Sequence, residues 1–461
     1  MNEKTKGKWR WTFFGIFLVA ACVVFSHTLV VECLLLNGAH ALKKVLVWID
    51  NRFDPDGSNG FSLTDLKRLK RELGTEELSY TVESGLINTV VVSGDRALPV
   101  KLTGVDYMYP MFNRLILAEG SPLTQKQEEE GAMVAVIDGD LAWELFKTTK
   151  ATGRTLEILG GTFRVIGVAK KDPGLTGQLT KEDLPAVYIP AAVFLERDAT
   201  ARITALQIKA ENSGLAGENI TPIETALRQI GKDPDRYRLI DYNIRQRLME
   251  QVPLLFRFLL GMFTIILLLA QVKENFVRLY VFLKEEGRTN YFFQVIKGNS
   301  RKVGIYLLQI GLRLVGIVLI VLVINFKLYI PPEYIPEDLI DVSFYLSLLK
   351  RILKQGQQSL GSQVPRPQLI ADTVTTLLNA LFSGAVVFGA VFFSVGFRKL
   401  QSLAIRLDRS LLSTSLLLLF SLLILVGVAI TLESPLLLPV KDLMLVWTFL
   451  LVSCMQERKG R

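Results

Sequence analysis

A long polar block, residues 37–251, lies between strongly apolar runs and constrains this chain more than any other feature. The run before it, 11–36, is apolar apart from His27 and Glu32. About 20 consecutive apolar residues are enough for a helix to cross a bilayer. We therefore expect a multi-pass α-helical membrane protein with a mixed α/β domain inserted between its first two helices. Further apolar runs follow the block at 253–272, 303–324, 373–397 and 411–430.

A sixth segment, 436–454, is harder to assign from its residues. It contains Lys441 and Asp442, and its charge-free part is short for a spanning helix. Whether this segment crosses the membrane stays open at this stage.

The charge pattern predicts an orientation. The formal net charge is +9 at pH 7, and much of the basic excess lies beside the apolar runs. Lys and Arg remain on the cytoplasmic side of a membrane. With residues 1–10 inside, the polar block and the 325–372 connection fall outside. The basic loops 273–302 and 398–410 then fall inside, so we expect the positive charge to set topology and no nucleic acid to be bound.

The first apolar run has two interpretations. Residues 19–22 resemble a lipoprotein cleavage box, which would indicate a removed signal peptide. The run continues well beyond Cys22 to Leu36, whereas a signal peptide has a shorter apolar core and then a polar mature start. We favour an uncleaved helix whose N-terminus is cytoplasmic.

Within the polar block, the pattern indicates a mixture of helices and strands. Ser62 and Asp65 have the spacing of a helix start, followed by leucines on one face, and 138–148 and 222–230 are expected helices. Gly160 and Gly161 predict a hairpin turn, and the acidic run 128–130 predicts a solvated loop. Strands are expected at 86–92, 99–105, 133–137, 155–159, 163–169, 186–189 and 203–210.

The sequence contains no recognisable catalytic constellation. It has two histidines and lacks the G-x-x-x-x-G-K-[ST], G-x-S-x-G, H-E-x-x-H and C-x-x-C patterns. These patterns supply phosphate loops, nucleophiles and metal ligands. We expect no catalytic residue, no metal and no directly bound cofactor, so the chain is not predicted to be an enzyme.

Two arginines lie inside expected membrane spans. Arg257 is about one turn into the 253–272 run, and Arg313 is deeper within 303–324. An intramembrane charge costs several kcal/mol unless it is shielded, so each arginine has two interpretations. The side chain either extends to the headgroups or contacts a partner inside the protein.

The predicted inside loop 273–302 interleaves aromatic and charged residues. This is typical of an amphipathic helix lying at the membrane surface. The alternative is a docking site for a cytoplasmic partner. The candidate contacts are Lys284, Glu285, Glu286, Arg288, Lys297, Gly298, Ser300 and Arg301.

The chain resembles the MacB/FtsX-type permeases of ABC transporters. The polar block carries LTGVDYMYP at 102–110, LAEG at 117–120, MVAVI at 133–137 and FRVIGV at 163–168, in the order of that family's periplasmic core domain. The run GNSRK at 298–302 resembles the family's G-A-S-R-R element. The sequence departs from the family at 289–292, where TNYF replaces R-E-I-G, at 308–311, where the usual glutamate is missing, and in the apolar segments after Arg409.

The resemblance implies a permease of the bacterial cell membrane with two protein partners. One is a cytoplasmic ABC ATPase that would bind the ATP, and the other is a second permease, identical or different. ATP-driven closure of the ATPase would push on 273–302 and do work in the outer domain, for export of a peptide, lipid or drug-like molecule.

Two alternatives remain open at this stage. A related mechanical complex would regulate a cell-wall hydrolase or extract lipoproteins. A receptor or scaffold would bind a ligand with its outer domain, although the short inside loops leave little room for a signalling domain.

Overall fold

The computed structural model describes residues 3–49, 60–84, 89–210, 218–286, 297–330, 364–389 and 407–455, with isolated residues between 335 and 350 and residue 391. The chain divides into two compact units. The helical unit comprises Met1–Leu29, Glu250–Leu328 and Thr376–Arg461, and the α/β unit comprises Val30–Met249 and Tyr329–Thr375. The divisions fall inside three helices, so α1, α9 and α13 each belong partly to both units.

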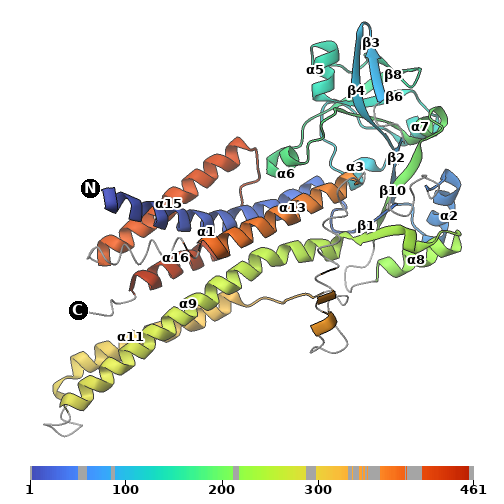
Figure 1. Ribbon diagram of the computed structural model, residues 1–461. Coiled ribbons are helices and arrows are strands. Elements are labelled where there is room, and N and C mark those ends of the chain that lie inside the picture. Colours follow the sequence, from blue (N-terminus) through green and yellow to red (C-terminus); the bar gives the residue numbers. More distant parts are fainter. Residues whose placement is uncertain are drawn as a thin grey trace. The chain divides into compact units, whose positions relative to one another are not determined.

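The helical unit confirms the expected fold class. Five helices of the described chain are long and apolar enough to cross a membrane. They include the first apolar run and all four runs expected after the polar block. The helices of this unit are α1 (Glu3–Leu36), α9 (Tyr242–Glu286), α11 (Ser300–Ile324), α13 (Arg366–Ser383) with the π-helical segment η3 (Gly384–Gly389), α15 (Leu407–Thr431) and α16 (Val440–Met455) (Figure 1).

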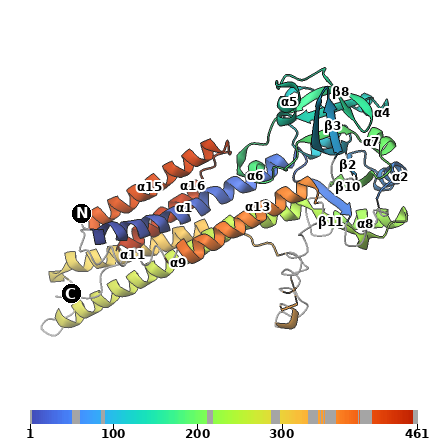
Figure 2. The ribbon, with the colours of Figure 1, turned by 45° about the horizontal axis from the view of Figure 1, so that its top comes forward.

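The sixth segment forms a helix, but a short one. α16 has 16 residues, which at a rise of 1.5 Å per residue is about 24 Å, less than the hydrocarbon core of a bilayer. It packs with α1 and α15 in one apolar cluster that includes Ala20, Leu418 and Phe449 (Figure 2). The segment left open by the sequence is therefore an integral part of the bundle.

α9 and α11 approach each other closely at one glycine. A Cβ atom on Gly261 would lie 2.2 Å from Cγ2 of Ile324, a separation that no real pair of carbon atoms adopts. The absence of a side chain at Gly261 allows the two helices to pack. Leu268, Ile320 and Ile324 continue the same contact as a buried cluster.

The α/β unit is built on a sheet of eleven strands in the described residues. Six of them close into a ring in the order β4, β9, β6, β8, β7 and β3, with β4 and β3 pairing to complete it. The path β2, β10, β1 and β11 extends the sheet from β4. The strands are β1 (Lys44–Ile49), β2 (Leu78–Glu83), β3 (Thr89–Ser93), β4 (Arg96–Val105), β5 (Leu117–Gly120), β6 (Val134–Asp138), β7 (Thr155–Ile158), β8 (Gly161–Ala169), β9 (Ala186–Pro190), β10 (Arg202–Lys209) and β11 (Tyr237–Asp241).

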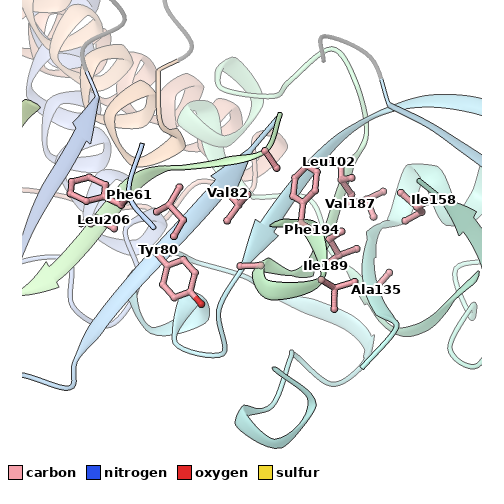
Figure 3. Close-up of a cluster of buried hydrophobic side chains, with 14 of the residues drawn as sticks. Phe61, Tyr80, Val82, Leu102, Ala135, Ile158, Val187, Ile189, Phe194 and Leu206 are labelled. Atoms are coloured by element: carbon pink, nitrogen blue, oxygen red, sulfur yellow. The ribbon is translucent and has the colours of Figure 1, made fainter. Parts of the chain in front are cut away.

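One hydrophobic cluster runs through the ring and the extension. Figure 3 shows Phe194 beside Leu102 and Ile189 at the centre of this cluster, and Phe61 beside Leu206 towards the extension. Phe194 comes from α7, which packs against β2, β4 and β9. The helices of this unit are α2 (Leu63–Leu73), α3 (Tyr109–Phe112), α4 (Gln125–Glu129), α5 (Gly139–Phe146), α6 (Gly174–Leu179), α7 (Ala191–Arg197) and α8 (Ile220–Gln229), with the 3-10 turn η1 (Pro234–Arg236).

Most expected elements of the polar block coincide with observed ones, and three details are corrected. The hairpin turn lies one residue earlier than predicted: Leu159 and Gly160 have φ of 47° and 68°, and Gly161 already pairs with Ile158. The acidic run is not simply a solvated loop, because Glu128 belongs to α4 and accepts hydrogen bonds from the Tyr80 hydroxyl at 2.8 Å and the Tyr107 N–H at 2.7 Å. β1, β2, β5 and β11 were not expected.

The start of α2 was anticipated from its sequence. Ser62 caps the helix by accepting a hydrogen bond from the Asp65 N–H, and the Asp65 carboxylate accepts one from the Ser62 N–H. This is a capping box, which satisfies two otherwise unpaired amide groups. Leu66 and Leu69 are buried, whereas Leu63 of the same expected face is exposed.

Candidate functional site

An ion pair links α9 to α16 inside the helical unit. The Arg257 guanidinium donates to both oxygens of the Asp442 carboxylate, with Nη2 3.0 Å from Oδ2. The Asp442 side chain is 4% exposed and that of Arg257 is 15% exposed. Of the two interpretations of Arg257, the structure therefore favours a protein partner over extension to the headgroups.

His27 of α1 joins the same carboxylate. Its Nε2 lies 3.3 Å from Oδ2 of Asp442, and its Nδ1 lies 3.0 Å from the Val23 carbonyl oxygen. Both ring nitrogens thus face oxygen atoms. Asp442 thereby connects three helices, α1, α9 and α16, through polar side chains within a mostly apolar bundle.

A second polar cluster surrounds Arg313 of α11. Its Nε donates to Oε1 of Gln271 on α9 at 3.1 Å, and Nε2 of Gln271 donates to the Val452 carbonyl of α16 at 2.8 Å. One turn along α9, Asn275 donates to Oε1 of Gln309 at 3.2 Å. Gln309 lies in the stretch where the MacB/FtsX-type permeases, which this chain resembles, carry a glutamate. Arg313 is therefore hydrogen-bonded to the neighbouring helix α9.

The docking candidates lie at the facing ends of α9 and α11. Lys284, Glu285 and Glu286 end α9, and Lys297 and Gly298 immediately precede α11, which begins with Ser300 and Arg301. Nζ of Lys302 lies 5.7 Å from the ring centroid of Phe282, which brings these two ends together. Arg288 and the 398–406 part of the second inside loop lie outside the described residues. The docking role of the candidates between Lys284 and Arg301 remains a prediction.

In the α/β unit, the last turns of α1 hold a short helix in place. Glu32 is 1% exposed, and its carboxylate accepts hydrogen bonds from the backbone N–H groups of Leu175 and Thr176, at 3.3 and 2.9 Å. These amides begin α6, where a carboxylate satisfies unpaired donors. A glutamate inside the first apolar run therefore fastens α1 to the domain.

α13 is fastened to the domain by its first residues. Arg366 donates to the Asp172 carboxylate and to the Tyr188 hydroxyl, the latter at 2.9 Å. Arg245, near the start of α9, donates to Asp372 at 2.5 Å and to Gln368 at 2.8 Å. The start of α9 and the start of α13 are thus linked to each other, and α13 is linked to the sheet.

A fully buried lysine sits at the start of β1. Nζ of Lys44 donates to the carbonyl oxygens of Asn37 and Phe112, at 3.0 and 2.6 Å, and to Oε1 of Gln207 at 2.9 Å. It also lies 4.8 Å from the ring centroid of Tyr242, the first residue of α9. Burial lowers the pKa of Lys44 to about 7. Sequence reasoning missed this residue because a lysine just after an apolar run looks like an ordinary solvated flank.

These contacts join side chains of the described residues that form no cluster of metal ligands. Within the ranges that the structure describes, no group of three or more His, Cys, Asp or Glu side chains is arranged to hold a metal ion. The arrangement instead connects long helices to one another and to a folded domain. Such contacts can transmit a movement.

The sequence of the α/β unit matches a known domain family. Residues 12–230 match the family model of the MacB-like periplasmic core domain. The macrolide export ATP-binding/permease protein MacB of Chlorobium phaeobacteroides is 24% identical over 185 residues, which are 39% of this chain and 28% of that protein. The uncharacterized ABC transporter permease YknZ of Bacillus subtilis is 26% identical over 153 residues, which are 33% of this chain and 37% of that protein.

Among solved structures, the periplasmic region of MacB from Actinobacillus actinomycetemcomitans aligns with 45% of this chain and 92% of that chain, at 16% identity and a TM-score of 0.37. The matched part of the present chain spans about three-tenths of the length of the MacB relative. The chain thus carries a MacB-like periplasmic core domain and is distantly homologous to the MacB and YknZ permeases.

Proposed function

Because this chain carries a MacB-like periplasmic core domain and is a distant homologue of ABC transporter permeases, we propose that it is the permease subunit of such a transporter. In this proposal a separate cytoplasmic ATPase binds and hydrolyses ATP. The permease itself catalyses no reaction and converts the ATPase movement into a rearrangement of the domain between α1 and α9.

The continuity of α9 carries the proposal. This helix runs for 45 residues, from Tyr242 immediately after β11 to Glu286, which corresponds to about 68 Å at 1.5 Å per residue. Along its length it holds Asp442 through Arg257, and Arg313 through Gln271. α9 is one continuous helix apart from the hydrogen bond that Pro253 cannot donate, so a push on its Glu286 end would be passed along the helix towards Tyr242.

The same proposal assigns a role to the cytoplasmic helix ends, to the α/β unit and to a second permease subunit. The ends of α9 and α11, with Lys284 and Arg301, form the ATPase contact on the cytoplasmic side, and the α/β unit lies in the outer compartment. A second permease copy, identical or different, completes the transporter beside membrane lipid. The work exports a peptide, lipid or drug-like molecule that reaches the outer domain.

Charge reversal at the docking region tests this proposal. The variant Arg288→Glu/Arg301→Glu is expressed in the native host with the chain's partners, and the copurified ATPase is quantified. We expect roughly a tenfold loss of recovered ATPase, equivalent to about 1.4 kcal/mol of binding free energy. The control Lys147→Glu/Lys150→Glu changes two exposed lysines of the α/β unit by the same charge. If both variants retain the ATPase and its activity equally, the proposed contact is wrong.

A further inference from the structure

The α/β unit contains a half-open cavity of about 120 Å³ that the transport proposal does not use. Its wall combines five segments of the domain with Arg366 at the start of α13. These segments are the link from α3 to β5, the end of β6, the link from β8 to α6, the end of α6 with the residues after it, and β9. The wall is rich in basic residues: Arg114, Lys170, Lys171, Lys181 and Arg366 all line it.

The acidic residues of the wall are already engaged. Asp172 accepts from Arg366, and Glu182 pairs with Lys101 at 2.7 Å. Asp138 caps α5 by accepting from the Asp140 N–H at 3.1 Å. Asp172 and Glu182 are therefore each paired with a cation, and the negative charge of Asp138 acts on Lys181.

The cations divide into two groups. Lys171 and Lys181 are both held by the Asp140 carboxylate, at 2.8 and 3.0 Å. For Arg114 and Lys170, no acidic side chain in the described part of the chain forms an ion pair. The backbone brings these two residues close, because the Lys170 N–H donates to the Ile116 carbonyl at 2.7 Å. Two uncompensated positive charges beside a concave surface create a local potential that attracts an anion.

We propose that this cavity binds a phosphate group, with Arg114 and Lys170 as its charged contacts. Phosphate offers several strong acceptor oxygens, which match the planar donor fork of an arginine and the point charge of a lysine. The cavity is smaller than the roughly 300–1,000 Å³ pockets that enclose drug-sized ligands. It therefore takes a single acidic group, while any larger remainder of the ligand extends through the open side.

The phosphate can come from two sources. One is free inorganic phosphate, and the other is the headgroup of an anionic lipid whose tails remain outside the cavity. Leu115, Ile116 and Tyr188 add apolar surface to the wall, where the first carbons of a lipid glycerol ester would pack. This site belongs to the folded domain, and it does not depend on the permease role.

The test uses the full chain in nanodiscs of phosphatidylcholine and isothermal titration calorimetry with three probes. These are inorganic phosphate, dihexanoylphosphatidic acid and, as the zwitterionic comparison without net charge, dihexanoylphosphatidylcholine. We expect saturable binding of a phosphate probe and none of the phosphatidylcholine. Comparable binding of both phosphate probes identifies free phosphate as sufficient, and binding of phosphatidic acid alone identifies a lipid headgroup.

Variants locate the binding. Arg114→Gln/Lys170→Gln should weaken it at least tenfold, the milder Lys170→Gln should weaken it less, and the control Lys147→Gln/Lys150→Gln should leave it unchanged. The thermal unfolding midpoint of each variant verifies that the domain is folded. If the double variant does not fold, the single variant Lys170→Gln is used to test the site. The proposal is overturned if neither phosphate probe saturates the wild-type chain, or if folded Lys170→Gln binds as tightly as wild type.

Discussion

Asp442 of α16 receives hydrogen bonds from Arg257 of α9, although the two residues are 185 positions apart in the sequence. His27 of α1 approaches the same carboxylate. A charge in the apolar part of a bundle is costly unless it is paired, so Arg257 and Asp442 each lower the cost of burying the other. The contact therefore fixes how three helices pack.

Removing the carboxylate should destabilise the bundle. Asp442→Asn leaves the half-buried Arg257 without its counter-charge, a change that costs up to about 3–5 kcal/mol when the charge is fully buried. We expect a lower thermal unfolding midpoint of the detergent-solubilised chain. The neighbouring Lys441 is exposed, so Lys441→Gln should have little effect. Replacing both partners, Arg257→Met/Asp442→Leu, should recover much of the loss, and no recovery would mean that packing rather than charge explains the effect.

Gly261 offers a steric test of the contact between α9 and α11. Gly261→Ala places a methyl group 2.2 Å from Cγ2 of Ile324 and should lower the unfolding midpoint, although alanine favours helix by about 1 kcal/mol. The matched control is Gly316→Ala in α11, where the new carbon would lie 3.8 Å from Cδ1 of Leu268. That variant should be neutral or stabilising. Gly261→Ala/Ile324→Ala should relieve the clash, and a stable Gly261→Ala chain would contradict the close approach.

Glu32 should determine how well the start of α6 is ordered. Glu32→Ala removes the acceptor for the Leu175 and Thr176 amides, so we expect faster hydrogen–deuterium exchange in the peptide that contains them. Glu32→Gln keeps one carbonyl acceptor and should give an intermediate rate. Unchanged exchange in Glu32→Ala would show that other contacts hold α6.

Lys44 predicts a specific pH dependence. Its pKa is about 7 when the chain is folded and near the ordinary value of 10.5 when it is unfolded. Between these values the unfolded chain binds more protons, so stability should rise as the pH increases from 7 towards 10.5. Below pH 7 both states are protonated and this contribution is constant.

The variant Lys44→Met tests that contribution. It should reduce stability at neutral pH, because the Asn37 and Phe112 carbonyls lose their donor, and it should flatten the rise of the unfolding midpoint between pH 7 and 10. Lys43→Met, which changes the adjacent exposed lysine, should retain the wild-type slope. Equal slopes in the two variants would assign the pH dependence to other groups.

The sequence predicted elements that depend on neighbouring residues better than contacts between distant ones. The capping box at Ser62 was recognisable because both partners lie within four residues. The turn at Leu159 was misplaced by one residue, since two consecutive glycines offered two registers and the pairing of Ile158 with Gly161 decided between them. β2 and β11 were missed because polar residues interrupt their apolar pattern, although Ser79 and Asp241 among them are buried.

For the candidate site too, the sequence indicated single residues better than their distant partners. Arg257 and Arg313 stood out as charges in apolar runs, but their partners could not be identified. Asp442 counted against a sixth helix when taken alone, although it is the counter-charge of Arg257. Lys44 and Glu32 gave no signal, because their roles come from backbone groups that only the fold brings together.

The central claim is that this chain works as a permease driven by a separate ATPase. It is tested most directly by isolating the chain from its native host in a gentle detergent, after mild crosslinking, and identifying the bound proteins by mass spectrometry. The account predicts a stoichiometric ABC ATPase, together with a second permease chain if the assembly is heteromeric. Recovery of the chain without any ATPase, even after crosslinking, would contradict it and would favour a receptor or scaffold.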